Sequence, residues 1–508
     1  MGETLPLFAS VLLSTPYAPA RDTLVRISPE GIPARPLKPE EQYRFHFDMT
    51  RCIGCKCCVV ACNEQNGNPA GINWRRVGEV EGGYYPFTQR HYLSMGCNHC
   101  LEPSCLTGCP TEAYHKDLAT GIVHHSAEAC IGCQYCTWNC SYGVPQYNPE
   151  RGVVGKCDMC HHRLFDGMAP ACASACPEGA IAIEIVNTRE WRANHVAANA
   201  PGLPSSGDSI STTRITLPRD LAPDTSRVDT GRMVLEEAHW PLVFMLVLTQ
   251  LSIGAFAVLW LLDLFAGGGN VSQPALLSLA MAGMSLGAST LHLGRPAYAW
   301  RALRGWRRSW LSREVFLLSA FAAAASVDCG LSFLHLGLRA WIGSAALLAG
   351  ISGIFCSARI YTVRARPAWY SSYTLAEFFA TVLLLGPLFV RASLPQAPPW
   401  MGWAAAGGAA AQLLIAALKF FWLSQAELFE LRASARLLSG RLRGFFLSRL
   451  ALLVAGGLVI PLAWNGRAAA IGAFAAVLAG EWLGRWLFFV SVVPKTMAAA
   501  FGEARKAA

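Results

Sequence analysis

Charged residues are scarce in this chain of 508 residues. Asp, Glu, Lys and Arg make up only 15% of it, whereas a soluble globular protein carries about 25%. Hydrophobic residues reach 53% and the mean hydropathy is +0.32, so a large part of the chain is expected in lipid. The same composition excludes a disordered chain, a collagen-like chain and a coiled coil.

Cysteine is almost absent from the second half of the chain. Seventeen of the 19 cysteines lie between Cys52 and Cys176, and only Cys329 and Cys356 follow. The chain therefore has a cysteine-rich half and an apolar half. The net charge is +9, but no basic patch is interleaved with stacking aromatic residues, so nucleic acid is not an expected partner.

The N-terminus lacks the marks of a targeting segment. The apolar run from Leu5 to Leu13 follows Glu3, with neither a basic residue before it nor a pair of arginines. Neither a secretory nor a twin-arginine signal is therefore expected, and residues 1–42 are predicted to form an irregular arm. The compartment stays open, because a partner subunit can carry the export signal.

Sixteen cysteines form an internal repeat of short spacings, each group having four members. The groups are Cys52, Cys55, Cys58 and Cys62; Cys97, Cys100, Cys105 and Cys109; Cys130, Cys133, Cys136 and Cys140; and Cys157, Cys160, Cys172 and Cys176. Two groups have the spacing C-x2-C-x2-C-x3-C and two end in Cys-Pro, as in bacterial ferredoxins. This pattern predicts four [4Fe–4S] clusters.

The spacing has a geometric reason. Three close thiolates wrap three corners of a cluster, and the fourth cysteine points away to ligate the other cluster of a pair. Zinc sites need four ligands rather than sixteen in paired runs, and a disulfide scaffold belongs to small secreted domains. Cys57 falls between ligands and is predicted to be a small buried side chain.

Four stretches carry a more specific resemblance: FHFDMTRCIGCKCCVVAC, GCNHCLEPSCLTGCP, CIGCQYCTWNCSYGVPQYNPERGVVGKCDMC and CASACPEGAIAI. They resemble the four-cluster iron–sulfur subunit of the dimethyl sulfoxide reductase family, over residues 43–186. The resemblance implies an α+β ferredoxin-like domain in which the first group pairs with the fourth and the second with the third. It also implies that the first cluster faces a molybdopterin catalytic subunit and that the last faces the membrane.

The same resemblance implies the ligands of each cluster. The sets are Cys52, Cys55, Cys58 and Cys176; Cys62, Cys157, Cys160 and Cys172; Cys97, Cys100, Cys105 and Cys140; and Cys109, Cys130, Cys133 and Cys136. After this domain, residues 187–238 lose their periodicity and are rich in Pro, Gly, Ser and Thr. They are predicted to form an extended polar linker that lies along a surface, such as that of a partner subunit.

The remaining sequence reads as apolar segments of about 20 residues, the length that spans a bilayer as a helix. Eight are predicted, at residues 241–265, 274–294, 314–336, 340–361, 373–391, 402–423, 445–464 and 468–492. Small residues are frequent in them, which favours close helix packing in lipid. The prediction is an all-α eight-helix transmembrane bundle over residues 239–498, followed by a short tail, 499–508.

Arginine is distributed unevenly between the loops of this bundle. The loops on the side of the cysteine-rich domain hold Arg295, Arg301, Arg304, Arg307, Arg308, Arg313, Arg364, Arg366, Arg432, Arg436, Arg441 and Arg443. The opposite loops hold little beyond Arg339, Arg391 and Arg467. The positive-inside rule then predicts an inner-membrane protein with the cysteine-rich domain in the cytoplasm. Binding of these arginines to a partner subunit or to lipid is the alternative.

The apolar half also shows a family resemblance. HWPLVFMLVLTQLSIGAF, LHLGRPAYAW, LSREVF, RPAWYSS and LAGEWLGRWLFF resemble the eight-helix membrane anchor of the same reductase family, which in most members is a separate chain. The resemblance implies that the two subunits are fused in this sequence. His292 and Glu314 match positions tied to quinol binding in the anchors.

Ionisable residues near the predicted helix ends suggest where a quinone, menaquinone or ubiquinone, would bind. His292, Glu314, Arg359 and Tyr361 lie there, and quinol chemistry needs a proton acceptor near each ring oxygen. The alternative is helix capping or pairing with loop arginines. Glu481 and Arg485 are spaced for an i, i+4 ion pair. His239 and His292 could hold a haem, but the resembled anchors have none, so none is expected.

These features predict an electron-transfer and membrane-anchor subunit that works between the quinone pool and a separate molybdopterin catalytic subunit, with no catalytic residue of its own. A cytoplasmic orientation is similar to the sulfite dehydrogenase branch, which reduces quinone. The alternatives are a quinol-oxidising dimethyl sulfoxide or polysulfide-type reductase subunit and an autonomous ferredoxin:quinone oxidoreductase. A proton pump ranks lowest, because its candidate residues, Asp263, Asp328, Glu377 and Lys419, are scattered.

Overall fold

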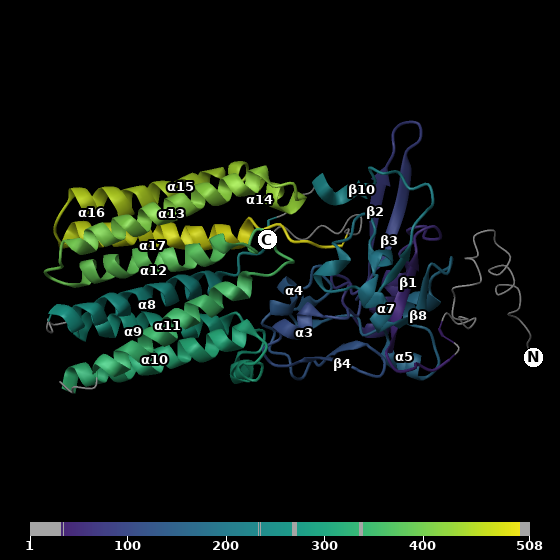
Figure 1. Cartoon of the computed structure of the whole chain (residues 1–508), viewed down its shortest axis with the longest axis horizontal. Helices are drawn as coiled ribbons and strands as arrows, with labels where there is room; N and C mark the ends of the chain where they lie inside the picture. Colours follow the sequence, from purple (N-terminus) through teal and green to yellow (C-terminus); the bar gives the residue numbers. More distant parts are fainter. Residues whose placement is uncertain are drawn as a thin grey trace, which may run out of the picture.

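The computed structural model describes residues 32–33, 35–231, 233, 235–266, 272–334 and 339–497. Most of the expected N-terminal arm and the tail after residue 497 lie outside these ranges. Figure 1 shows two parts side by side, a mixed α/β domain built from the cysteine-rich half and a bundle of long helices. The predicted fold, a ferredoxin-like iron–sulfur domain followed by eight apolar helices, is confirmed.

Short strands and short helices alternate in the cysteine-rich domain. The strands are β1 (Glu41–Asp48), β2 (Arg76–Gly82), β3 (Gln89–Met95), β4 (Tyr114–Lys116), β5 (Val123–His125), β6 (Gln146–Asn148), β7 (Val153–Gly155) and β8 (Ile181–Asn187). The helices are α2 (Cys57–Asn66), α3 (Ser104–Gly108), α4 (Tyr135–Asn139), α5 (His161–Phe165) and α6 (Ala171–Ser174). β1 pairs antiparallel with β8, with Phe47 opposite Ile181. This pairing brings the first cysteine group beside the fourth.

The expected linker at residues 187–238 has more structure than an extended connection. It forms α7 (Thr188–Ala193), β9 (Arg214–Thr216) and β10 (Ser226–Arg227), and these strands extend the sheets of β1 and β2. The hydroxyls of Thr212 and Thr213 donate to Asn98, at 2.6 Å to its carbonyl and 2.8 Å to its side chain. The polar composition of this segment predicts exposure to solvent. In the structure, its threonines instead donate hydrogen bonds to a buried residue of the cysteine-rich domain.

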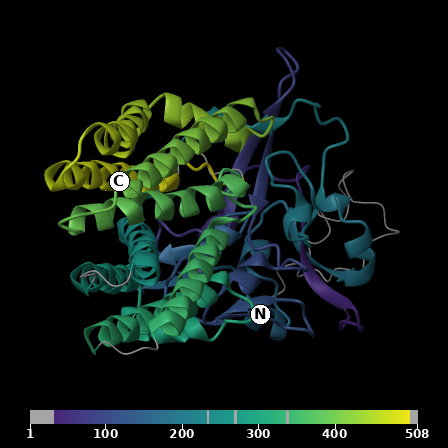
Figure 2. The same ribbon diagram turned by 60° about the vertical axis from the view of Figure 1, so that its left-hand side comes forward.

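In the part of the chain that the structure describes, eight helices are long and apolar enough to cross a membrane, and their bounds differ from the predicted ones by at most four residues. The elements are α8 (Trp240–Ala266), α9 (Ser272–Leu291), α10 (Trp310–Leu334), α11 (Arg339–Tyr361), α12 (Ser372–Ser393), α13 (Trp400–Gln425), α15 to α16 (Arg443–Ala463) and α17 (Arg467–Val490). The shorter α14 (Phe429–Ser439) follows α13. Figure 2 shows α8–α11 and α12–α17 as two neighbouring groups of helices. They touch where a Cβ on Gly254 would lie 3.1 Å from the Cα of Gly386, a close approach of the kind that small residues permit.

Candidate functional site

Four sets of cysteines come together in the structure, and each set joins two groups of the sequence. Cys52 lies near Cys55, Cys58 and Cys176, and burial together with these thiols raises its pKa to about 11. The corresponding neighbours of Cys62 are Cys157, Cys160 and Cys172. Those of Cys105 are Cys97, Cys100 and Cys140, and those of Cys136 are Cys109, Cys130 and Cys133. These are the sets that the family resemblance implies.

Left-handed backbone residues shape the loops that hold these sets. Gly132 has φ +70° and Gln134 has φ +58°, and the equivalent Gly54 and Lys56 have φ +73° and +63°. Such turns aim backbone N–H groups at sulfur, as in the 3.4 Å contact from Gly132 N to Cys130 Sγ. Gly132 is also required sterically, because a Cβ there would lie 2.9 Å from the Cα of Gly294.

The donor set fits iron–sulfur clusters. All 19 cysteines are free thiols, and backbone N–H groups reach Cys109 Sγ at 3.3 Å and Cys176 Sγ at 3.2 Å, the kind of hydrogen bond that tunes a bound cluster. Burial and mutual repulsion oppose ionisation of the thiols, and a metal centre with positive iron offsets both effects. A bound cluster supplies one-electron transfer. The four cysteine sets of this chain would hold it.

Cys57 contradicts its prediction, because its side chain is exposed rather than buried. It begins α2 directly after the left-handed Lys56. Cys58 and Cys62, four residues apart on that helix, occupy its buried face. The neighbouring position therefore points to solvent.

Two buried cations, Arg75 and Lys156, lie beside the cysteines and could not be predicted from the sequence pattern. Burial alone would lower the pKa of Arg75, but the charges of Cys172 and Cys58 raise it above its ordinary value. Its guanidinium also donates to the Ser94 carbonyl at 3.3 Å. Lys156, only 3% exposed, donates to the Cys157 carbonyl at 2.7 Å and acts electrostatically on Cys97. Neither residue lies in a spacing pattern that would have identified it.

The cysteine set nearest the helices is held directly by a loop of the bundle. His292 Nε2 donates to the Cys133 carbonyl at 3.2 Å. Three residues on, Arg295 donates its backbone N–H to the Ile131 carbonyl at 3.1 Å. Gly305 N reaches the Pro110 carbonyl at 2.8 Å. The loop between α9 and α10 therefore forms hydrogen bonds with both segments that carry this set, one around Cys133 and one around Pro110.

Aromatic rings fill the space around His292. Trp138, on the cysteine-bearing α4, lies between the rings of His239, His292, Tyr361, Trp369 and Phe489, with ring centroids 5.2 to 6.3 Å away. His239 and His292 are in edge-to-face contact at 5.2 Å. Burial lowers the pKa of each to about 4, so both rings are neutral near pH 7.

The four predicted quinone residues lie around two aromatic residues of α4, Tyr135 and Trp138. His292 and Tyr361 meet through Trp138. Glu314, 6% exposed on α10, and Arg359 both act on the hydroxyl of Tyr135, whose pKa is raised mainly by burial. The Arg359 guanidinium lies 5.4 Å from the centre of the Trp310 ring. The sequence pattern did not identify Tyr135 and Trp138. Together with His292, Glu314, Arg359 and Tyr361 they form a site that we call the His292 junction.

A pocket enclosing about 650 Å³ of space, part of it open to the surroundings, lies among α12, α13, α14, α15 and α17. Lys419 and Glu377 form an ion pair of 2.9 Å inside it. Glu481 and Arg485 do not make the predicted direct ion pair among the described residues, although Glu481 is the charge that acts most strongly on Arg485. Arg485 donates to Gln250 at 2.9 Å, and Glu481 accepts from Thr381 at 2.7 Å. Polar groups of neighbouring helices lie closer to each side chain than the other residue does.

Comparison with known families finds one match in the cysteine-rich part and one in the first part of the helical bundle. Residues 88–185 match the 4Fe-4S dicluster domain, and residues 233–402 match the DMSO reductase anchor subunit, DmsC. One polypeptide of the anaerobic dimethyl sulfoxide reductase of Haemophilus influenzae is 38% identical over 170 residues, which are 32% of this chain and 82% of that protein. A sulfite dehydrogenase subunit of Allochromatium vinosum is 34% identical over 160 residues, which are 27% of this chain and 67% of that protein.

A third relative comes from a different kind of complex. The formate dehydrogenase-O iron–sulfur subunit of Escherichia coli is 36% identical over 187 residues, which are 32% of this chain and 60% of that protein. The cysteine sets, the eight helices and these matches agree on one assignment. The chain belongs to the dimethyl sulfoxide reductase family of membrane complexes, in which it unites an iron–sulfur electron-transfer subunit and a membrane anchor in one polypeptide.

Proposed function

We propose that this chain passes electrons between membrane quinone and a separate molybdopterin catalytic subunit through four [4Fe–4S] clusters. One observation carries the proposal: His292, at the end of α9, donates to the Cys133 carbonyl. This bond joins the anchor directly to a loop that carries cluster ligands. A redox carrier in the bundle and the last cluster would thus be held in a fixed relation.

The opposite end of the cysteine series supports a partner subunit there. The set of Cys52, Cys55, Cys58 and Cys176 lines a surface pocket, and Cys55 is exposed. Ile53 and Val60 add apolar side chains that are 58% and 61% exposed. A first set with one exposed member and a last set against the bundle suit a chain of carriers between a docked subunit and the membrane.

For the quinone, menaquinone or ubiquinone, we propose the junction of His292, Glu314, Arg359 and Tyr361. Ionisable groups inside membrane spans usually have a function, and Glu314 is buried on α10. Neutral His292 and the Glu314 carboxyl are suitable partners for the proton exchange of quinone. In this proposal Arg359 and Tyr361 position the headgroup.

We further propose a sulfite dehydrogenase-like direction, with quinone as acceptor and the iron–sulfur domain in the cytoplasm. The arginine excess on that side supports it. A quinol-oxidising reductase subunit is the alternative. An alkaline phosphatase fusion after the last residue tests the orientation: low phosphatase activity is expected, and strong activity would place the domain outside.

Purification in mild detergent from the native host, followed by metal analysis and sizing, tests the main proposal. Molybdenum or tungsten together with a large second subunit is the expected result, and turnover would then be measured with sulfite and with sulfoxides. A lone 54.8 kDa chain that contains iron and still reduces quinone would overturn it in favour of an autonomous ferredoxin:quinone oxidoreductase.

A further inference from the structure

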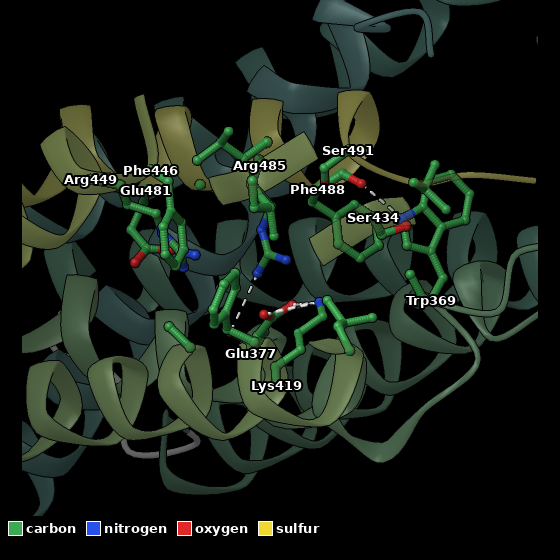
Figure 3. A pocket seen from close by; sticks show the side chains of 18 residues that line it. Trp369, Glu377, Lys419, Ser434, Phe446, Arg449, Glu481, Arg485, Phe488 and Ser491 are labelled. Carbon is green, nitrogen blue, oxygen red and sulfur yellow. Dashed lines mark hydrogen bonds and ion pairs between the residues drawn. The ribbon is translucent and has the colours of Figure 1, made fainter. Parts of the chain in front are cut away.

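The pocket among α12, α13, α14, α15 and α17 borders the His292 junction through Trp369 and Phe488 and has unusual contents for the interior of a helix bundle. Figure 3 shows Glu377, Lys419 and Arg485 at its middle, Trp369, Phe488 and Ser434 at one end, and Arg449 and Glu481 at the other. Three cations face two carboxylates. Buried charges in membrane spans are costly and mark function by default.

Unpartnered polar atoms indicate that the pocket receives something from outside the chain. Arg449 Nε, Arg485 Nε and Glu481 Oε1 are buried with no hydrogen-bond partner among the described residues. All three side chains line the pocket and are at least nine-tenths buried. Because an unsatisfied buried polar group costs free energy, water or a ligand is expected to complete these bonds.

The lining selects the chemistry of that ligand. Apart from these polar groups the pocket is apolar and aromatic: Trp369 stacks on Phe488 with ring centroids 4.9 Å apart and planes 8° apart. Lys419 Nζ lies 5.4 Å from the centre of the Phe488 ring. The carboxylates of Glu377 and Glu481 offset two of the three cations, so the lining keeps little net positive charge for a phosphate. A flat, lipophilic, uncharged headgroup with hydrogen-bonding oxygens meets these conditions better than a phospholipid headgroup does.

The pocket also touches the redox part of the molecule. Trp369 lines it and packs edge-to-face on Trp138, with ring centroids 5.7 Å apart. Trp138 lies on α4 between Cys136 and Cys140. A headgroup against Trp369 would therefore be separated by two indole rings from a helix that carries cluster ligands.

We propose that this pocket binds a quinone headgroup, as a second site distinct from the His292 junction, with Lys419 as the donor to a ring oxygen. The inference rests on the proposed function, which makes quinone the membrane substrate. Gly484 lines the site, and a Cβ there would lie 2.5 Å from Arg449 Nε and would displace that side chain.

Photolabelling with an azido-quinone tests the proposal on the full chain, purified with any partner that accompanies it. Labelled peptides from α13 or α17 are expected. Their yield should fall about tenfold or more in Lys419→Met, which loses a charged hydrogen bond. Gly484→Ala, which keeps the charges, should also reduce it. Asp328→Asn is the matched control, because it removes a buried carboxylate near Arg339 instead.

The outcomes separate this inference from the proposed function. The second site is overturned if the label is confined to α10 and α11. It is also overturned if label on α13 and α17 is unchanged in both variants. Either result leaves the proposed use of quinone by this chain intact. Displacement of the label by added cardiolipin but not by unlabelled quinone assigns the pocket to lipid and overturns it too. Absence of all labelling together with absence of quinone turnover overturns both proposals.

Discussion

The cysteine-rich domain and the helical bundle both bury charged side chains, but they neutralise them in different ways. Arg75 lies among cysteines that would hold clusters, so its natural counter-charge is a cofactor. In the bundle, Lys419 lies 2.9 Å from Glu377, so its counter-charge is another residue of the chain. The charge of Arg75 therefore depends on a bound metal centre for its balance, whereas the charge of Lys419 is balanced within the chain.

The largest effect is expected from removing a cluster ligand. Cys109→Ser should remove the cluster nearest the membrane and lower quinone-linked turnover at least a hundredfold, because every electron would pass that point. Iron content and electron paramagnetic resonance of the purified protein measure the loss. Cys57→Ser is the control: its exposed thiol lies outside the sets, so all signals should persist. Unchanged turnover in Cys109→Ser would contradict a linear path.

In the bundle, breaking the internal ion pair should cost stability without affecting metal. Lys419→Met leaves the Glu377 carboxylate buried and unpaired, which typically costs about 3–5 kcal/mol. A lower midpoint of thermal unfolding with unchanged iron content is expected. The double variant Lys419→Met/Glu377→Gln removes both charges and should recover most of the loss. If the single and double variants were equally unstable, the pair would not be the self-balancing unit.

The two regions also differ in how far the sequence predicts them. Cysteine spacing and apolar length are periodic signals, so the ferredoxin-like domain and the eight spans were predictable. Trp138, Arg75 and Thr212 have no such signal, because their roles arise from contacts between distant segments. For Cys57 and for the pair Glu481–Arg485 a local signal was present, but it predicted the wrong contact. The direction of the helix turns the Cys57 side chain to solvent. A nearer polar group on another helix, Thr381, takes the hydrogen bond of Glu481.

The junction between the regions should be sensitive to acid through His239. Burial lowers its pKa to about 4, with Arg366 lowering it and Glu236 raising it. A histidine whose folded pKa lies below its unfolded value of about 6.5 stabilises the fold above pH 6.5 and loses that contribution as the pH falls toward 4. His239 alone should therefore lower the free energy of unfolding by roughly 2 kcal/mol between pH 7 and pH 4.5. Thermal unfolding at a series of pH values measures the fall, to which His292 adds a similar share. His239→Phe should flatten this part of the profile, and an unaltered profile would exclude His239 as its source.

The smallest and most specific effect is expected at Arg75. A positive charge beside a cluster favours the reduced, more negative form, so Arg75→Met should lower the reduction potentials of the clusters bound by the Cys58 and Cys172 sets. The shift should be on the order of 50 mV, the size of a partly screened charge interaction. Redox titration followed by electron paramagnetic resonance measures it. Arg90→Met is the matched control, because Arg90 is 59% exposed and pairs with Glu79 at the surface, where solvent screens its charge. A drop of equal size in both variants would mean that net charge, rather than the buried position among the thiolates, sets the potential.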